Sequence, residues 1–236
     1  MDAVAHAAAT GLAQERAYAY IKEAITAVRF RPGQRLGTEE IAQAVSASRT
    51  PVREALSRLA QEGLVEREGG WGYVVKHVSV KDVLDLFNVR EVLELEAARE
   101  VISYLDDDVI EDLVAMNARA EEHFRLGQFE MFLRQNRQFH EAIARATQNR
   151  LLQQMLGAIH DRVRQVGTLT VKLHKPRLKE LLEENRQILA AVRRKDGPAL
   201  ERAVRSHIRR GRQHVMRMIT ATNSDRLSLV LSTREA

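Results

Sequence analysis

The sequence predicts a mainly α-helical protein in which an N-terminal winged helix-turn-helix precedes an all-α bundle of six to seven helices. Three observations predict this fold class. Only 12 Gly and 4 Pro occur among 236 residues, so little interrupts helices. Residues 13–77 have the pattern of three helices and a β-hairpin, whereas residues 78–222 show long helical periods with hardly a strand signal. Hydrophobic residues make up 44% of the chain, which is enough to bury a core.

Changes in composition and in hydrophobic pattern also divide the chain into domains and tails. We expect a flexible tail over residues 1–12, the winged helix-turn-helix domain over 13–77, the all-helical domain over 78–222 and a polar C-terminal tail over 223–236. The first tail is assigned because residues 1–12 are small, Ala-rich and without an apolar row that would need a partner, and the second because the stretch after Asn223 is polar.

Each element of the first domain has a local signal. A row of apolar residues at steps of three and four predicts a helix from Gln14 to Arg29, which Pro32-Gly33 ends. Thr38 begins a short helix that runs to about Val45. Another helix begins at Ser48 and closes at Gly63. Two short apolar runs around Gly69-Gly70-Trp71-Gly72 predict the hairpin.

The helix that begins at Ser48 has the division of faces that a DNA-recognition helix needs. Arg49 and Arg53 are four residues apart, opposite the apolar row of Val52, Leu56 and Leu59. One face can therefore pack while the other presents guanidinium groups to guanine O6 and N7. The alternative is a merely solvated face, which the surrounding order of elements disfavours.

Other groups beside these arginines suit contacts with DNA. Ser48 and Thr50 are candidate phosphate ligands, and Gly72 would let the hairpin approach the duplex closely. Between Arg29 and Arg58 the sequence has six arginines and three glutamates, which is a local net charge of +3. Residues 1–78 as a whole have ten basic and nine acidic residues, so the first domain is almost neutral. One copy would thus bind weakly, which favours a homodimer on a repeated half-site.

The run TEEIAQAVSASRTPVREALSRLAQEGLVEREGGWGYVV, residues 38–75, resembles the N-terminal signature of GntR-type bacterial transcription regulators. The later segments NVREVLELEAA and NRQFH resemble the FCD-type effector domain of that family. Together the two resemblances cover nearly all of residues 14–220. They imply a homodimeric, ligand-responsive regulator, usually a repressor, that binds a short palindrome. They also imply DNA contacts by Arg49 and Arg53, with Ser48 and Thr50 beside them.

Five polar residues interrupt apolar rows on different predicted helices of the second domain. They are Arg90, Asn136, His140, Asn185 and His207. A single such histidine is more often a satisfied core residue, but five positions that converge favour a ligand cavity. An arginine keeps its charge and matches a carboxylate with two parallel hydrogen bonds, so we expect a small anionic metabolite.

The FCD resemblance implies a divalent metal, held by an Asp and a His four apart and by two later His. The matching positions here are Asn136, His140, Asn185 and His207. A neutral amide is a poor zinc donor, so a zinc-like ion on His140, His207 and Asn136 is only one possibility. Otherwise the amides bind the effector directly, as in the metal-independent members of the family that accept larger acyl ligands.

Other functional classes find less support in the sequence. His140, His207 and Glu141 lack the nucleophile, phosphate loop or acidic metal pair of an enzyme. A constitutive architectural DNA-binding protein stays an alternative.

The absence of Cys suits the cytoplasm, and no apolar run is long enough to span a membrane. A basic run over residues 193–217 is either a second anion surface or, preferably, a solvated face paired with the acidic stretches from Glu94 to Glu100 and from Asp106 to Asp112.

Overall fold

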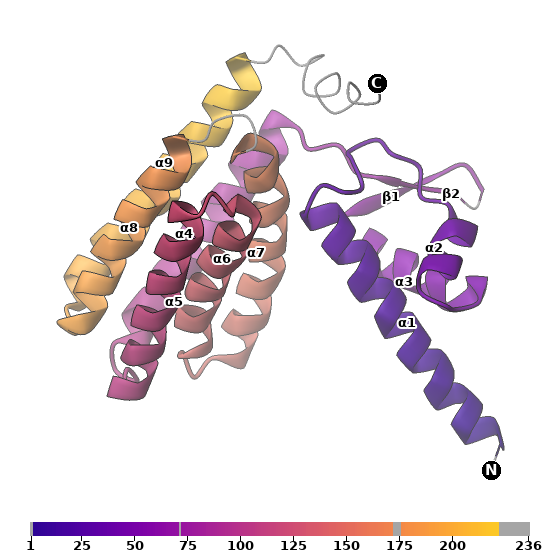
Figure 1. Cartoon of the computed structure of the whole chain (residues 1–236), viewed down its shortest axis with the longest axis horizontal. Helices are drawn as coiled ribbons and strands as arrows, with labels where there is room; N and C mark the ends of the chain where they lie inside the picture. The colour runs from indigo at the N-terminus through magenta and orange to yellow at the C-terminus, as the bar shows by residue number, and fades with distance from the viewer. Residues whose placement is uncertain (1, 71, 172–175, 222–236) are drawn as a thin grey trace. The chain divides into compact units, whose positions relative to one another are not determined.

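The computed structural model describes residues 2–70, 72–171 and 176–221, which form two compact units, one ending at Val78 and the other beginning at Ser79. It confirms the predicted fold class, because a winged helix-turn-helix is followed by an all-α unit (Figure 1). The predicted tail over residues 223–236 and Trp71 of the hairpin lie outside the described residues. Over the described part of the chain, no helix is long and apolar enough to cross a membrane.

The first unit contains helices α1 (Asp2–Thr26), α2 (Thr38–Ala44) and α3 (Arg49–Gln61) and strands β1 (Val65–Glu68) and β2 (Gly72–Val75). Helix α1 begins at Asp2, so the segment 1–12 that the sequence predicts as a tail is largely helical. Its buried residues pack with those of α3 in one core around Ile21, Ile25, Leu56 and Leu59.

The two strands pair antiparallel, with Val65 opposite Val75 and Glu68 opposite Gly72. The segment that precedes α2 adds backbone hydrogen bonds to the outer side of β2, since Leu36 N donates to Tyr73 O and Val75 N donates to Gln34 O. Val65 and Val75 are buried in the core of the unit. The hairpin is thereby fixed to the helices as a wing.

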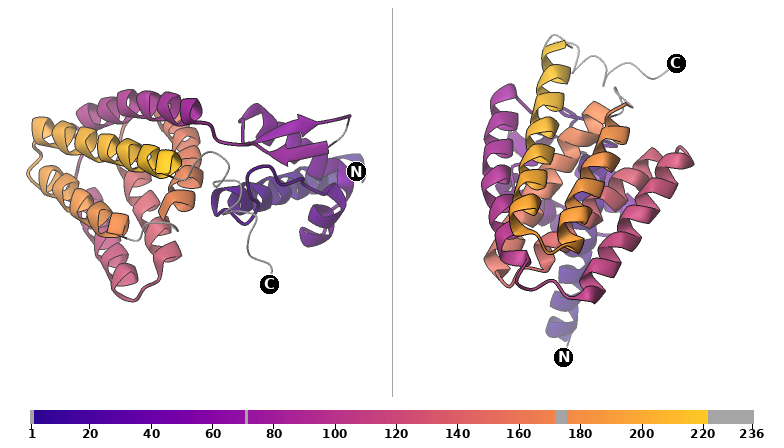
Figure 2. Two further views of the ribbon diagram at one scale, coloured as in Figure 1. Left: turned by 90° about the horizontal axis from the view of Figure 1, so that it is seen from above. Right: turned by 90° about the vertical axis from the view of Figure 1, so that its left-hand side faces the viewer.

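The second unit consists of the helices α4 (Val80–Val101), α5 (Asp107–Arg125), α6 (Phe129–Arg145), α7 (Arg150–Val171), α8 (Pro176–Arg193) and α9 (Gly197–Ala221). Figure 2 shows these helices packed alongside one another. Contacts join α4 to α9 and α7, α6 to α5 and α7, and α8 to α5 and α9. The helices therefore enclose a common interior, to which α4, α6, α7, α8 and α9 all contribute.

Local sequence sets where two of these helices begin. Ser79 and Asp82 form a reciprocal capping box at the start of α4, and the Asp106 side chain accepts a hydrogen bond from Val109 N at the start of α5. These caps satisfy backbone N–H groups that have no partner within the helix. The start of α4 thus coincides with the start of the second unit.

Candidate functional site

Helix α3 divides into a buried and an exposed face, as its sequence predicts. Pro51, Val52, Ala55, Leu56 and Leu59 are buried. The four predicted contact residues on this element, Ser48, Arg49, Thr50 and Arg53, are all exposed. Since the packing face is separate from the polar face, the guanidinium groups can engage a partner without disturbing the core.

Two details of this element could not be read from the sequence. The guanidinium of Arg49 forms an ion pair with the carboxylate of Glu39 on α2, and both side chains are exposed. Ser48 is the N-cap residue of α3, but its side chain makes no capping hydrogen bond in the described structure. The pair of exposed charges is weak in water, so a phosphate or a base edge could replace the carboxylate.

Gly72 is the first residue of β2 rather than the tip of the hairpin. A Cβ atom at this position would lie 2.6 Å from the carbonyl oxygen of Glu68. The pairing of the two strands therefore requires a glycine here for a structural reason. This reason is independent of any approach to DNA, and the described residues between the two strands are Gly69 and Gly70.

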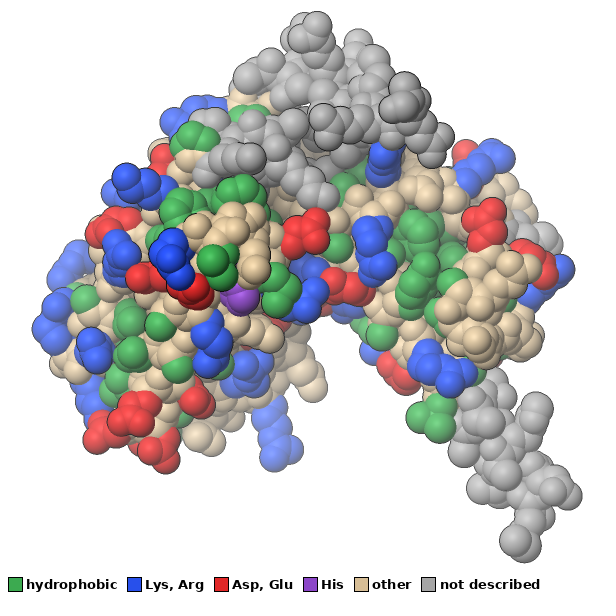
Figure 3. Space-filling model, in the orientation of Figure 1, with side chains coloured by type: hydrophobic (Ala, Val, Ile, Leu, Met, Phe, Trp, Pro, Cys, Tyr) green, Lys and Arg blue, Asp and Glu red, His purple; other side chains and the backbone are tan. Residues whose placement is uncertain are grey.

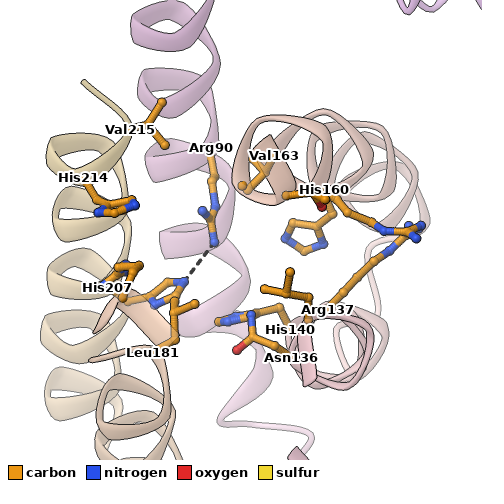
Figure 4. Close-up of a pocket in the computed structure, with 16 residues that line it drawn as sticks. Arg90, Asn136, Arg137, His140, His160, Val163, Leu181, His207, His214 and Val215 are labelled. Atoms are coloured by element: carbon orange, nitrogen blue, oxygen red, sulfur yellow. Dashed lines mark hydrogen bonds between the residues drawn. The ribbon is translucent and has the colours of Figure 1, made fainter. Parts of the chain in front are cut away.

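A cavity of about 110 Å³ lies inside the second unit, lined by residues of α4, α6, α7, α8 and α9. Of the five predicted residues, Arg90, Asn136, His140 and His207 line it. Figure 4 shows that the side chains of Arg90 and His207 approach it from one side and those of His140 and His160 from the other. The structure thus brings together four predicted residues from three helices.

Asn185 is fully buried beside this group and does not line the cavity. Its Nδ2 donates a hydrogen bond of 2.8 Å to Oδ1 of Asn136. The prediction that Asn185 itself faces the ligand is therefore not supported by the geometry. Its contact instead holds the amide of Asn136 in a fixed orientation.

Arg90 is almost completely buried and has two hydrogen-bonding partners. Its Nε donates to Oε1 of Glu94 one turn along α4, and its Nη2 lies 3.1 Å from Nε2 of His207. A guanidinium has five N–H donors, so three remain that no described contact uses. The carboxylate of Glu94 matches the charge of Arg90 inside the unit.

Burial opposes ionisation of Glu94, yet Arg90 and the hydrogen bond from His160 outweigh it and hold the pKa of Glu94 well below its ordinary value. Glu94 therefore carries its charge at neutral pH.

A second buried ion pair continues this network towards α8. Arg177 donates from Nη1 to Oε1 of Glu184 at 2.6 Å and from Nη2 to Oε2 at 2.8 Å. Nδ1 of His207 lies 2.8 Å from the same Oε2. Because a carboxylate only accepts, His207 carries its hydrogen on Nδ1 and leaves Nε2 to accept from Arg90.

The imidazoles of His140 and His207 are held neutral by their surroundings. Burial lowers the pKa of His140 well below its ordinary value, and the neighbouring His207 adds to this. Burial also lowers the pKa of His207, against the opposing hydrogen bond with Glu184. The rings of His140 and His207 stack with their centroids 4.6 Å apart.

The four positions that the FCD resemblance implies as metal ligands do not fit a divalent ion in this arrangement. Nδ2 of Asn185 donates to Oδ1 of Asn136, and both nitrogens of His207 have partners, so only Oδ1 of Asn185 and Nε2 of His140 are left as donor atoms without one. One of those partners is the cation Arg90, which would repel a second positive charge. Across the described residues, no group of three or more His, Asp or Glu side chains could hold a metal ion.

Four residues of the network escaped the sequence reasoning, namely Glu94, His160, Arg177 and Glu184. The signal for Glu94 was its spacing of four residues from Arg90, which places both side chains on one helix face. His160 follows Leu152 and Leu156 at steps of four and so also interrupts an apolar row.

The basic run of the last helix is paired in part with the first helix of the unit. Arg205 and Arg209 both bind Glu91, and Arg99 binds Glu201. On the visible face of the unit, Lys and Arg side chains alternate with Asp and Glu (Figure 3). This arrangement agrees with a solvated, paired face rather than with a second anion surface.

Comparison with known proteins agrees with both units. Residues 13–75 match the family described as bacterial regulatory proteins, gntR family, and residues 85–210 match the FCD domain family. The chain is 26% identical over 203 residues to the uncharacterized HTH-type transcriptional regulator YdhC of Bacillus subtilis, covering 86% of this chain and 90% of that protein. It is 27% identical over 214 residues to the HTH-type transcriptional repressor RspR of Escherichia coli, covering 89% and 92%.

Among solved structures, the E. coli protein McbR/YncC has the same fold, with a TM-score of 0.80 at 22% sequence identity over 89% of this chain and 99% of that one. The FCD match alone spans more than half of the residues, and the gntR match accounts for the winged unit. The chain therefore belongs to the GntR family of bacterial transcription regulators, of the type that carries an FCD domain, and is a DNA-binding protein rather than an enzyme.

Proposed function

We propose that this regulator is a cytoplasmic repressor that senses a small carboxylate metabolite in the cavity of its helical unit. The ligand would contact Arg90, Asn136, His140 and His207 directly, without a metal ion. Ser48, Arg49, Thr50 and Arg53 on and before α3, and the wing around Gly72, would contact a short palindromic operator. A homodimer would bind the two half-sites.

The observation that carries this proposal is a mainly apolar cavity whose wall includes buried polar side chains that are not fully satisfied. Nε2 of His140 and Nδ1 of His160 are buried without a hydrogen-bonding partner in the described structure. A buried polar group in this state is unfavourable by about 1–3 kcal/mol. A ligand that supplies the missing partners would recover this free energy, and the three remaining N–H donors of Arg90 suit a carboxylate.

The size of the cavity favours a small ligand over a long acyl chain. Its volume is about 110 Å³, whereas a cavity of about 150 Å³ holds one benzene molecule. On this scale a carboxylic acid of two or three carbons, with four or five non-hydrogen atoms against the six of benzene, is of the right size. A larger acyl ligand would require the helices that line the cavity to separate.

An exposed apolar face on α4 and α7 supports the homodimer. Val92 and Leu151 are 68% and 65% exposed, and Met155 is 45% exposed. Together with Leu93 and Leu152 they line an open groove of about 500 Å³. A second copy of the chain would cover these side chains, which a soluble monomer seldom exposes together.

The test begins with DNA sequences that the protein selects from a random pool. Small carboxylic acids are first screened for a rise in the melting temperature of the protein. Each acid that raises it is then added to a fluorescence-anisotropy titration of the selected DNA. We expect at least one acid to weaken DNA binding. If acids bind but leave DNA affinity unchanged, the protein is a constitutive DNA-binding protein instead.

A further inference from the structure

Glu39 on α2 places a carboxylate beside the guanidinium of Arg49 at the start of α3. Oε2 of Glu39 pairs with Nη2 of Arg49, and the two side chains are 57% and 61% exposed. Helices α2 and α3 pack against each other, and Ile41 and Ala42 of α2 are buried in the core that they share (Figure 1). The position of Glu39 is therefore set by the fold of the winged unit, while its carboxylate faces solvent.

The ion pair uses only part of the guanidinium of Arg49. A guanidinium has five N–H donors, arranged as two edges that each offer two parallel donors. The carboxylate of Glu39 takes at most one of these edges, so the other stays available to DNA. Guanine needs one such edge, since its O6 and N7 accept two parallel hydrogen bonds from an arginine. Arg49 can therefore bind guanine without giving up Glu39.

A backbone phosphate differs from guanine because it is itself an anion. A phosphate at the second edge of Arg49 brings its charge close to that of Glu39, and like charges repel. Guanine carries no net charge and meets no such repulsion. We propose that Glu39 is a positioning residue that directs Arg49 to guanine and keeps it from backbone phosphates. This inference rests on the proposed contact of Arg49 with DNA and adds the residue that makes this contact selective.

The pair would raise the ratio of specific to non-specific DNA affinity. Every DNA sequence offers phosphates, so contacts with them strengthen the binding of all sequences alike. An arginine that a carboxylate already holds loses less rotamer freedom when it binds a guanine. At a site without a guanine in reach, the same arginine stays paired with Glu39 and contributes little to binding.

Two substitutions in the same turn of α2 test this inference. Glu39→Gln removes the charge that pairs with Arg49, and Glu40→Gln at the neighbouring exposed glutamate changes the net charge equally. Anisotropy titrations of the full-length proteins use the selected DNA and a scrambled duplex of equal length and base composition. We expect Glu39→Gln to bind the scrambled duplex at least about threefold more tightly than Glu40→Gln does. It should bind the selected duplex no more tightly than Glu40→Gln does.

The salt dependence of binding gives a second readout, because it counts the phosphates that are contacted. Each phosphate contact with B-DNA changes the slope of log affinity against log salt concentration by about 0.9. In Glu39→Gln the side chain of Arg49 is released to a phosphate of the scrambled duplex. The slope should therefore be steeper than in Glu40→Gln, by up to about 0.9 for each bound copy. A merely structural role of Glu39 would weaken binding to both duplexes and add no phosphate contact.

The Arg49→Ala background shows whether Glu39 acts through Arg49. There, Glu39→Gln should change the ratio of the two affinities no more than Glu40→Gln does. A change that persists would mean that Glu39 meets DNA itself, which overturns the positioning role. Equal behaviour of Glu39→Gln and Glu40→Gln when Arg49 is present would also overturn it and leave Arg49 as a DNA contact. If Arg49→Ala binds the selected DNA as tightly as the wild type, the proposed contact fails together with this inference.

Discussion

Replacing Arg90 by Met tests the buried ion pair at the centre of the helical unit. Arg90 and Glu94 are 4% and 7% exposed, so the substitution leaves an ionised carboxylate inside the unit with only His160 as a partner. Removing one member of a buried pair is unfavourable by about 3–5 kcal/mol, because the other charge stays uncompensated. We expect Arg90→Met to lower the free energy of unfolding of this unit by that amount.

A double-mutant cycle gives the matched control. In Arg90→Met with Glu94→Gln neither charge remains, and Gln can still accept from His160. Replacing a whole buried pair by neutral groups is often close to neutral, so the double variant should regain most of the lost stability. Urea unfolding, followed by circular dichroism, measures the free energy of unfolding of the wild type, Arg90→Met, Glu94→Gln and the double variant. A single variant that loses less than about 1 kcal/mol would refute the description of this pair as buried and essential.

The same cycle predicts a dependence on pH. The pKa of Glu94 is lowered in the folded protein, so its contribution to stability is fully present above the ordinary glutamate pKa of about 4.3 and is lost as the pH falls below that value. The free energy of unfolding of the wild type, measured relative to that of the double variant, should therefore fall as the pH is lowered from about 5. A difference that stays constant over this range would contradict the ionised state of Glu94.

Three further predictions concern the other surfaces and the metal. Arg49→Ala and Arg53→Ala should each weaken binding to the selected DNA by about 1–3 kcal/mol in anisotropy titrations, while Arg125→Ala on the helical unit should not. Val92→Asp with Leu151→Asp should turn a dimer into a monomer in light scattering, whereas Leu126→Asp, at a side chain that is 53% exposed just after α5, should leave it a dimer. Elemental analysis of protein purified without chelators should find far less than one divalent ion per chain. A stoichiometric ion would contradict the geometry of Asn136 and Asn185.

The sequence predicts most of the fold because its signals are local. The capping residues, the apolar rows and the glycines around the wing determine helices and strands without reference to distant residues. The start of α1 is the exception, since the Ala-rich segment has high helix propensity but no apolar row to show it. Propensity alone gives little information about whether such a segment is a tail or a helix.

The site is less predictable because it depends on how far each helix is rotated. Arg90 and His207 were found as polar interruptions of apolar rows, and His160 carries the same signal. Asn185 carries it as well, yet its side chain meets Asn136 and not the cavity. Glu94 was counted with an acidic surface stretch, although its spacing from Arg90 places it inside the unit. Whether a residue of α4 lies on the surface or in the interior depends on which helices pack against α4, and the sequence does not specify them.

A response to a ligand requires two conformations of the protein that differ both in affinity for the ligand and in affinity for DNA. Helix α4 carries Arg90, and its cap residue Ser79 directly follows the last residue of the winged unit. If an acid weakens DNA binding by some factor, thermodynamic linkage requires that the selected DNA weaken acid binding by the same factor. Calorimetric titration of the acid into free protein and into the protein–DNA complex measures this factor. Unequal factors would mean that the acid acts on a different species, such as the dimerisation equilibrium, rather than on one protein with two coupled sites.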